Sequence, residues 1–341
     1  MFKYFKGSFI VTVLGLLAAF FWGKHIGVSA LECVYIASIL AVLEVSLSFD
    51  NAVVNATKLE KMTPKWRHRF ITWGILIAVF GMRFIFPLTV VSIFSHLNMA
   101  SVLDMALHDS ASYSHYLEIT HAPIVTFGGA FLFMLFMDYF TEEDKICWIK
   151  PIEHNFQKLS KVKGICTITT LILLGTLYFN LSADIRQQVF LSGIYGIITY
   201  LLIDGFSEWL EKKQEDASFS KVFKYSGLVS FLYLELIDAS FSLDGVLGAF
   251  ALSQDIVIIT LGLFIGAMFV RSLTIMLVEK KTLQQFLFLE HGAHWAIGTL
   301  AILMFVSTKF EVPEVVTGTL GLAFILSSLF SSIVHNKKNN I

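Results

Sequence analysis

Long apolar stretches, separated by short polar segments, follow one another along the whole chain of 341 residues. Ten of these stretches are apolar enough and long enough to be transmembrane helices, which need roughly 20 residues to cross the hydrocarbon core. The pattern therefore predicts an all-α, polytopic helical membrane protein with about ten transmembrane helices. The expected spans are 8–23, 31–57, 69–94, 121–140, 165–182, 188–208, 225–251, 255–278, 292–308 and 313–335.

Composition and charge agree with this pattern. Hydrophobic residues make up 56% of the chain and charged residues 15%, against about 25% charged residues in soluble domains. With the N-terminus in the cytoplasm, 20 of the 25 lysines and arginines fall in cytoplasmic segments and three in outer segments. This asymmetry follows the positive-inside rule, so both termini are expected in the cytoplasm. We expect the first span to be retained rather than removed as a signal peptide.

A motif of two acids and two serines occurs twice inside apolar spans. Residues 44–50 read EVSLSFD and residues 238–244 read DASFSLD. The copies lie in the second and seventh predicted spans, which run in opposite directions if all ten spans exist. This arrangement predicts an inverted-topology repeat, as in secondary transporters with a substrate site between the repeats. The expected segments are an N-terminal span (1–30), a first repeat (31–140), a connecting segment with two spans (141–224), a second, inverted repeat (225–310), and a C-terminal span with a short basic tail (311–341).

Ionisable side chains near the centre of a membrane helix cost roughly 2.5–3.5 kcal/mol each on insertion scales, and they commonly mark ion pathways. In the first motif helix, four polar side chains at helical spacing form one stripe: Glu44, Ser48, Asn51 and Asn55. In the second motif helix, the corresponding stripe consists of Glu235, Asp238 and Ser242. Asp50 and Asp244 lie about 100° from these stripes on an ideal helix, and a local break would bring them round.

All of these side chains would bind a ligand through oxygen, and neither motif contains histidine or cysteine. An oxygen-only set suits Mg²⁺, Ca²⁺ or Mn²⁺ better than Zn²⁺ or Cu⁺, and ligand type does not choose among the first three. An arginine lies in the span after each motif, at Arg83 and Arg271. Two arginines cannot neutralise five acids, so a cation pathway is favoured over internal ion pairing alone. We expect both arginines to hold the acids when no ion is bound.

Two longer stretches around the motifs, LEVSLSFDNAVVNA (43–56) and DASFSLDGVLGAFA (238–251), resemble the signatures of the TerC family of integral membrane proteins, within the lysine-exporter superfamily. The arginine-bearing segments GMR (81–83) and GAMFVR (266–271) are similar to those of the family as well. The likeness is to a less characterised branch, because Gly245 stands where many members have serine and the 95–120 segment is longer.

The resemblance implies efflux of a divalent metal cation, chiefly Mn²⁺, with tellurium resistance as an older association. The ion ligands that it implies are Glu44, Asp50, Asn51, Asp238 and Asp244. The side chains that we expect to support them are Ser48, Asn55, Glu235, Ser242, Arg83 and Arg271. The expected partners are the metal ion as substrate and the lipid bilayer of a bacterial inner membrane, with no nucleic acid and no bound cofactor; a homo-oligomer is left open.

We expect a transporter rather than an enzyme. The sequence contains no phosphate-binding loop or nucleophile motif, so coupling to the proton gradient is expected, because protons compete with cations for crowded carboxylates. One alternative is a non-transporting, metal-binding membrane subunit linked to stress or tellurium resistance. The others are a transporter for another solute, such as an amino acid, and an intramembrane aspartyl hydrolase with Asp50 and Asp244 as its dyad.

Two further polar segments lie outside the motifs. The outer segment 95–120 is rich in acids and histidines and lacks lysine and arginine. We expect it to be a solvated acidic loop rather than a metal site. The segment LEHGAHW (289–295) contains Glu290, His291 and His294, which we expect at the polar start of a helix.

Overall fold

The computed structural model of the chain describes residues 2–77, 81, 84–95, 97–142, 146–215, 227–232, 234–236, 238, 249, 252–253, 255–280, 285–310 and 312–338. Within these ranges the chain is helical and forms no strand. It divides into two compact units. The first unit consists of Met1–His121 and Glu235–Thr282, and the second of Ala122–Leu234 and Leu283–Ile341.

Six of the described helices are long and apolar enough to cross a membrane. A seventh span is formed if Ala30–Ser46 and Asn51–Glu60, which meet at an angle of 53°, are counted as one bent helix. The protein is therefore an all-α membrane protein, as the sequence pattern predicts. The number ten stays a prediction. The expected spans 69–94 and 225–251 run into residues outside the described ranges, and 165–182 corresponds to a shorter apolar helix, Ile165–Asn180.

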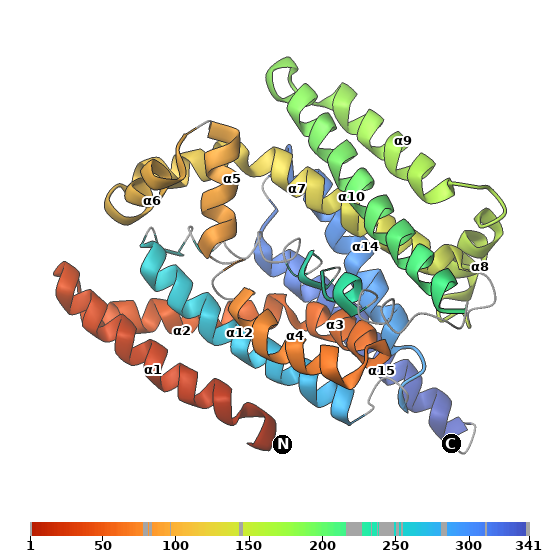
Figure 1. The fold of residues 1–341 in the computed structure, drawn as a ribbon, viewed down its shortest axis with the longest axis horizontal. Coiled ribbons are helices and arrows are strands. Elements are labelled where there is room, and N and C mark those ends of the chain that lie inside the picture. The colour runs from red at the N-terminus through yellow and green to blue at the C-terminus, as the bar shows by residue number, and fades with distance from the viewer. Residues whose placement is uncertain are drawn as a thin grey trace. The chain divides into compact units, whose positions relative to one another are not determined.

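The first unit is built around one long apolar helix, α12 (Ile256–Glu279), which packs against α1, α2, α3 and α4. Figure 1 shows α12 running beside α1 and α2. The other helices of this unit are α1 (Phe2–Ile26), α2 (Ala30–Leu47), α3 (Phe49–Lys61), α4 (Pro64–Leu76), α5 (Phe86–Ser95), α6 (Met99–His108) and the first part of α7 (Ser110–Thr141).

Small residues bring α2 and α12 close together. A Cβ atom on Gly262 would lie 2.6 Å from Leu40 Cβ and 2.9 Å from the carbonyl oxygen of Ala37. One turn later, Gly266 meets Ala41 and Glu44 in the same way. Apolar side chains gain little by leaving lipid for another helix, so close backbone approach is a main source of helix–helix affinity in membranes.

The start of α12 is fixed by Asp255. Its Oδ1 accepts hydrogen bonds from the backbone N–H groups of Val257, at 2.8 Å, and Ile258, at 3.2 Å. This is an N-cap, which satisfies donors that the helix itself cannot pair. Its Oδ2 accepts a hydrogen bond from Trp22 Nε1 at 2.8 Å. One aspartate therefore joins the C-terminal half of α1 to the start of α12.

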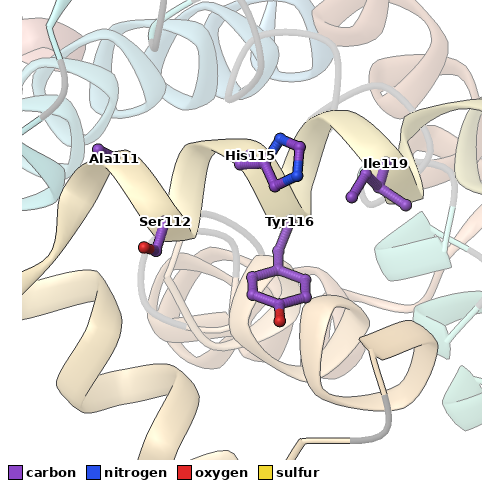
Figure 2. Close-up of a pocket in the computed structure, with 5 residues that line it drawn as sticks. All are labelled: Ala111, Ser112, His115, Tyr116 and Ile119. Atoms are coloured by element: carbon purple, nitrogen blue, oxygen red, sulfur yellow. The ribbon is translucent and has the colours of Figure 1, made fainter.

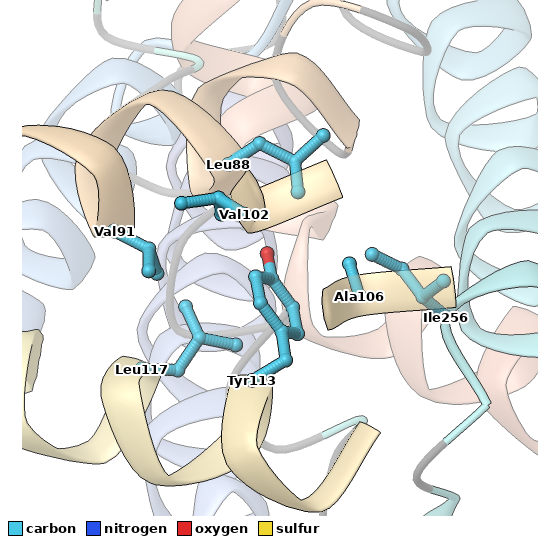
Figure 3. Close-up of a cluster of buried hydrophobic side chains, with 7 residues drawn as sticks. All are labelled: Leu88, Val91, Val102, Ala106, Tyr113, Leu117 and Ile256. Carbon is cyan, nitrogen blue, oxygen red and sulfur yellow. The ribbon is translucent and has the colours of Figure 1, made fainter. Parts of the chain in front are cut away.

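The described part of segment 95–120 is helical rather than a loop, apart from the residues next to each end of α6, so the loop prediction was wrong. Its apolar residues at helical spacing, Val102 and Ala106 on α6 and Tyr113 and Leu117 on α7, are buried. They pack with side chains of α5 and with Ile256 (Figure 3). The expected polar exposure is confirmed for Asp104, His108, Asp109, His115 and Glu118. The hydroxyl and N–H of Ser112 lower the pKa of Asp109 by hydrogen bonding to its carboxylate.

The second unit contains the rest of α7 together with α8 (Lys150–Leu159), α9 (Ile165–Asn180), α10 (Ala183–Glu215), α14 (Leu289–Ser307) and α15 (Glu314–Lys338). The helices α14 and α15 pack as a pair, and so do α9 and α10. Glycines again allow close approach, since a Cβ on Gly292 would overlap the side chain of Ser328. A Cβ on Gly129 would lie 3.3 Å from the carbonyl oxygen of Ala301.

Two glycines of this unit, both with open space around them, are expected to respond to alanine with opposite signs. Gly164 precedes α9 with φ +72°, a conformation that costs an alanine about 1–2 kcal/mol. Gly175 lies within α9, where alanine favours the helix by about 0.5–1 kcal/mol. We expect Gly164→Ala to lower, and Gly175→Ala to raise or leave unchanged, the thermal unfolding midpoint of the purified protein in detergent. Equal shifts for both variants would contradict the assigned backbone conformations.

Candidate functional site

The first motif lies where a membrane helix bends. The helix α2 ends at Leu47 and α3 begins at Phe49, with Ser48 as the residue shared between them (φ −100°, ψ 17°). The two segments meet at 53°. On an ideal helix Asp50 would lie away from the polar stripe, and a local break of this kind would bring it toward the stripe. Asp50 belongs to α3, but its side chain lies outside the described part of the structure.

The polar stripe of the first motif is buried along its whole length. The exposed fraction is 2% for Glu44, 7% for Ser48, 2% for Asn51 and 5% for Asn55. Ser48 Oγ donates a hydrogen bond to Glu44 Oε1 at 3.0 Å. By contrast, Ser46 is exposed, and its hydroxyl bonds within its own helix, to the carbonyl oxygen of Val42 at 2.9 Å. Helical spacing therefore separates the buried from the exposed residues of the motif correctly.

The polar stripe of the first motif helix meets the second motif in the first unit. Asn51 Nδ2 donates a hydrogen bond to Asp238 Oδ1 at 2.6 Å, across 187 positions of the sequence. A short bond to a carboxylate is the stronger, charge-assisted kind. This contact joins α3 to the segment that carries the second motif.

A cavity of about 20 Å³ lies beside this contact. A cavity of roughly 10–15 Å³ can hold one water molecule, so this cavity has room for about one particle of that size. Its polar lining consists of Asn55, Asp238, Arg271 and Thr274, and its apolar lining of Phe70, Ala267 and Val270. Asn55 Oδ1 is buried and accepts no hydrogen bond from any residue in the described ranges.

Arg271 supplies the positive charge at the cavity. Its guanidinium carbon lies 4.2 Å from the centroid of the Phe70 ring, a cation–π contact. Arg271 and Asp238 are also the charged groups that act most strongly on Glu235, which is 5% exposed. Glu44 lies on the same helix pair as Asn55, and its Cβ and Cγ contact α12 at Gly266. The site thus brings acids of both motifs and one arginine into a single unit.

Several predicted site residues lie outside the described residues: Arg83, Ser242 and Asp244. Among the residues that are described, no group of three or more histidine, cysteine, aspartate or glutamate side chains is arranged to hold a metal ion. The five predicted ligands include Asp244 and the side chain of Asp50, so the predicted ligand set remains a prediction.

The chain from Phe49 almost to its end matches one family model. The model is described as "Protein of unknown function (DUF475)", and the match covers residues 49–339. The chain belongs to this family. No curated protein matches the chain. No solved structure matches it either.

The part of the chain that the DUF475 model covers contains most of the candidate site. Asn51, Asn55, Asp238 and Arg271 all lie within 49–339, and the match begins at the first residue of α3. Glu44 and Ser48 precede it. The hydrogen bond between Asn51 and Asp238 and the cavity beside it therefore lie within the part of the chain that the family model matches.

Sequence reasoning did not single out Phe70 or Thr274. Both line the cavity, but Phe70 is one of 33 phenylalanines and no motif surrounds it. The packing of α4 against α12 is what distinguishes the ring of Phe70 from the phenylalanine rings that are expected to face lipid. Thr274 lies one turn beyond Arg271 on α12, and helical spacing from that arginine is the signal that would have identified it.

A second buried polar cluster, in the second unit, was also missed. Glu153 of α8 is 2% exposed. Its carboxylate accepts hydrogen bonds from the N–H of Trp148 at 2.6 Å and from Trp295 Nε1 at 2.8 Å, and it lies 3.8 Å from His291 Nε2. In the sequence Glu153 reads as one more charge in a basic cytoplasmic segment, so its burial is a product of tertiary packing.

The histidines of the LEHGAHW segment are part of this cluster. The predicted start of a helix at this segment is confirmed, because α14 begins at Leu289, and both His291 and His294 are buried. Tyr139 of α7 stacks on His294, with 3.6 Å between ring centroids, and His294 Nδ1 lies 2.8 Å from the carbonyl oxygen of Glu290. The contacts of Glu153, Tyr139 and the two histidines hold α8 against α7 and α14.

An open hollow of about 500 Å³ lies on the N-terminal part of α7. Figure 2 shows its lining residues, which all come from this one helix: Ala111, Ser112, His115, Tyr116 and Ile119. The lining contains no acid, and it is separate in composition from the site that the motifs form. We assign no binding role to it.

Proposed function

We propose that this protein is a membrane transporter that exports a divalent metal cation, with Mn²⁺ as its principal substrate, through an oxygen-lined site between two inverted repeats. The resemblance to the TerC family suggests the substrate. The single observation that carries the proposal is the hydrogen bond between Asn51 and Asp238. It joins the polar stripe of the first motif helix to an acid of the second motif, far away in sequence, next to a cavity of suitable size for one small particle.

The donor set of this region suits a hard divalent cation. Carboxylate and carboxamide oxygens are the ligands that Mn²⁺, Mg²⁺ and Ca²⁺ prefer. The cavity presents the carboxylate of Asp238 and the side-chain oxygen of Asn55, a buried acceptor without a described donor. Burying an acceptor without a hydrogen bond costs free energy, and a bound cation would offset that cost. In our proposal Glu44, Asp50, Asn51 and Asp244 complete the ligand set as the cation moves through the protein.

The proposed architecture has ten transmembrane helices, both termini in the cytoplasm of a bacterium and an inverted repeat. Repeats of this kind rock about a central site to expose it to each side of the membrane in turn. The bend at Ser48 supports this proposal, because transporters commonly bind ions where a membrane helix is interrupted. Protons moving in the opposite direction would supply the energy.

Flux measurements with purified protein in proteoliposomes test the proposal. We expect the wild-type protein to carry Mn²⁺ across the membrane and to distinguish it from Ca²⁺, as read by an enclosed metal-sensitive dye. The double variant Asp50→Asn, Asp244→Asn is expected to lose this flux, because each substitution removes a negative charge from a motif. Ser46→Ala is the matched control, since Ser46 belongs to the motif but is exposed, and we expect it to transport normally.

The outcomes separate transport from its main alternative. Binding of Mn²⁺ by the wild-type protein without flux would favour a metal-binding subunit. Absence of both binding and flux would overturn the proposal and leave the acids with a structural role or an unrelated solute. Flux that survives in the double variant would place the pathway away from the motifs.

A further inference from the structure

The guanidinium group of Arg271 lies on an aromatic ring at the edge of the cavity. Its central carbon is 4.2 Å from the ring centroid of Phe70, which is itself 3% exposed. Both residues line the cavity, together with Asp238. A cation–π contact is stronger where water is excluded, so the ring of Phe70 helps to retain the guanidinium at this position.

Glu235 lies near the same guanidinium. A Cβ atom on Gly74 of α4 would overlap both Arg271 Nη2 and Glu235 Oε1, so the missing side chain leaves room for the two groups to come near each other. Glu235 is 5% exposed, and neither of its carboxylate oxygens accepts a hydrogen bond from a described residue. A buried carboxylate in this state depends on nearby positive charge. Burial and the nearby Asp238 both disfavour the ionised form of Glu235, and Arg271 favours it.

Charge balance limits what this cavity holds at one time. Glu235 and Asp238 together carry two negative charges when ionised, and Arg271 carries one positive charge. A divalent cation bound to Glu235 and Asp238 would take the place of the guanidinium as the positive partner of these two acids. Two positive groups held close together in a buried place repel each other strongly, so the cation and the guanidinium compete for the position beside the acids.

We propose that Arg271 is an internal competitor for the transported cation. Its guanidinium occupies the charge site beside Glu235 and Asp238 when no ion is bound, and its return displaces the ion. Phe70 is the positioning residue that holds the guanidinium at the site. The inference rests on the proposed function and adds to it the group that drives release of the substrate.

The proposal and a purely structural role of Arg271 predict opposite changes in the affinity for Mn²⁺ when Arg271 is replaced. If Arg271 merely locked the helices together, Arg271→Gln would weaken both Mn²⁺ binding and flux. If Arg271 competes with the ion, Arg271→Gln binds Mn²⁺ more tightly and transports it more slowly, because release is no longer driven. Phe70→Leu loosens the guanidinium and is expected to tighten Mn²⁺ binding by roughly threefold to tenfold, the range that a partly desolvated cation–π contact covers.

Equilibrium binding of Mn²⁺ to the full-length protein in nanodiscs, paired with flux in proteoliposomes, tests this inference. The variants are Arg271→Gln, Phe70→Leu and the double variant. In the double variant the effect of Phe70→Leu is expected to disappear, since the ring acts only through the guanidinium. Phe70→Tyr keeps the ring and is expected to bind like the wild type. If Arg271→Gln does not fold, the comparison of Phe70→Leu with Phe70→Tyr still tests the inference.

A matched control comes from the same helix as Phe70. Arg69 of α4 lies over the ring of Trp66, with 4.5 Å from its guanidinium carbon to the centroid, and neither residue lines the cavity. We expect Arg69→Gln to leave Mn²⁺ binding unchanged. Weaker or unchanged Mn²⁺ binding in Arg271→Gln, or an effect of Phe70→Leu that persists in the double variant, would overturn the competitor role while leaving transport intact. If the wild type neither binds nor carries Mn²⁺, the proposed function falls first and this inference with it.

Discussion

Substitution of Gly266 by leucine is expected to separate α2 from α12 and to prevent the first unit from folding. Even a single added carbon has no room, because a Cβ on Gly266 would lie 2.5 Å from Glu44 Cβ and 2.7 Å from the carbonyl oxygen of Ala41. The second of these is a backbone atom, so the conflict is relieved only if the helices move apart. Overpacking of this kind costs about 1–3 kcal/mol for one or two methylene-sized groups and more for a larger side chain.

A smaller substitution, of Gly266 by alanine, would also change the site, because a Cβ on Gly266 would overlap the side chain of Glu44. We expect Gly266→Ala to lower the thermal midpoint of the purified protein in detergent and to reduce Mn²⁺ flux by displacing the Glu44 side chain. Gly7→Ala on α1 is the matched control, since Gly7 is a helical glycine of the same unit with nothing within 4 Å of an added Cβ. A Gly266→Ala protein with wild-type stability and flux would show that α2 and α12 do not pack in the way described here.

Substitution of Asn51 by leucine is expected to reduce transport by roughly tenfold to a hundredfold. The change removes the donor of the 2.6 Å hydrogen bond to Asp238. A hydrogen bond to a charged group contributes about 1.5–3 kcal/mol, and each 1.4 kcal/mol corresponds to about a factor of ten in rate. The bond joins the two motif segments, so its loss would remove a hydrogen-bond partner of Asp238 and change the position of Asp238 at the cavity.

An exchange of the two side chains gives this prediction a sharper form. The double variant Asn51→Asp, Asp238→Asn keeps one carboxylate and one carboxamide at the contact and reverses their places. We expect it to recover a substantial part of the flux that Asn51→Leu loses. Asn180→Leu is the control, since Asn180 is exposed and its side chain bonds only within α9, to the carbonyl oxygen of Thr176. Loss of flux in Asn51→Leu without recovery in the exchanged variant would contradict the assignment of this loss to the hydrogen bond between the two side chains.

Local properties of the chain were predictable from its sequence. The apolar stretches predict membrane helices because burying a polar backbone in lipid requires each span to satisfy its own hydrogen bonds. The spacing of Glu44, Ser48, Asn51 and Asn55 predicts one face of a helix, and all four are buried while Ser46 is exposed. The helical spacing of Val102 with Ala106, and of Tyr113 with Leu117, also contained the information that the outer segment is helical, although its polar composition favoured a loop.

The contacts between elements were not predictable in the same way. Periodicity assigns a side chain to a face of its own helix but contains no information about which helix that face meets. The bond between Asn51 and Asp238 spans 187 positions. The contact of the Phe70 ring with Arg271, and the hydrogen bond from Trp295 to Glu153, likewise come from pairs of elements distant in sequence.

The sequence by itself determined that this is a helical membrane protein with a buried polar stripe and a repeated acidic motif, because hydropathy and helical spacing are properties of single segments. Tertiary structure alone decided that the stripe of the first motif meets Asp238 of the second, that Gly266 makes room for Glu44, and that Arg271 contacts Phe70 and lies near Glu235. These arrangements depend on how closely the backbones of different helices approach. Small residues such as Gly74, Gly262 and Gly266 allow a short distance, but they do not determine which helices pack together.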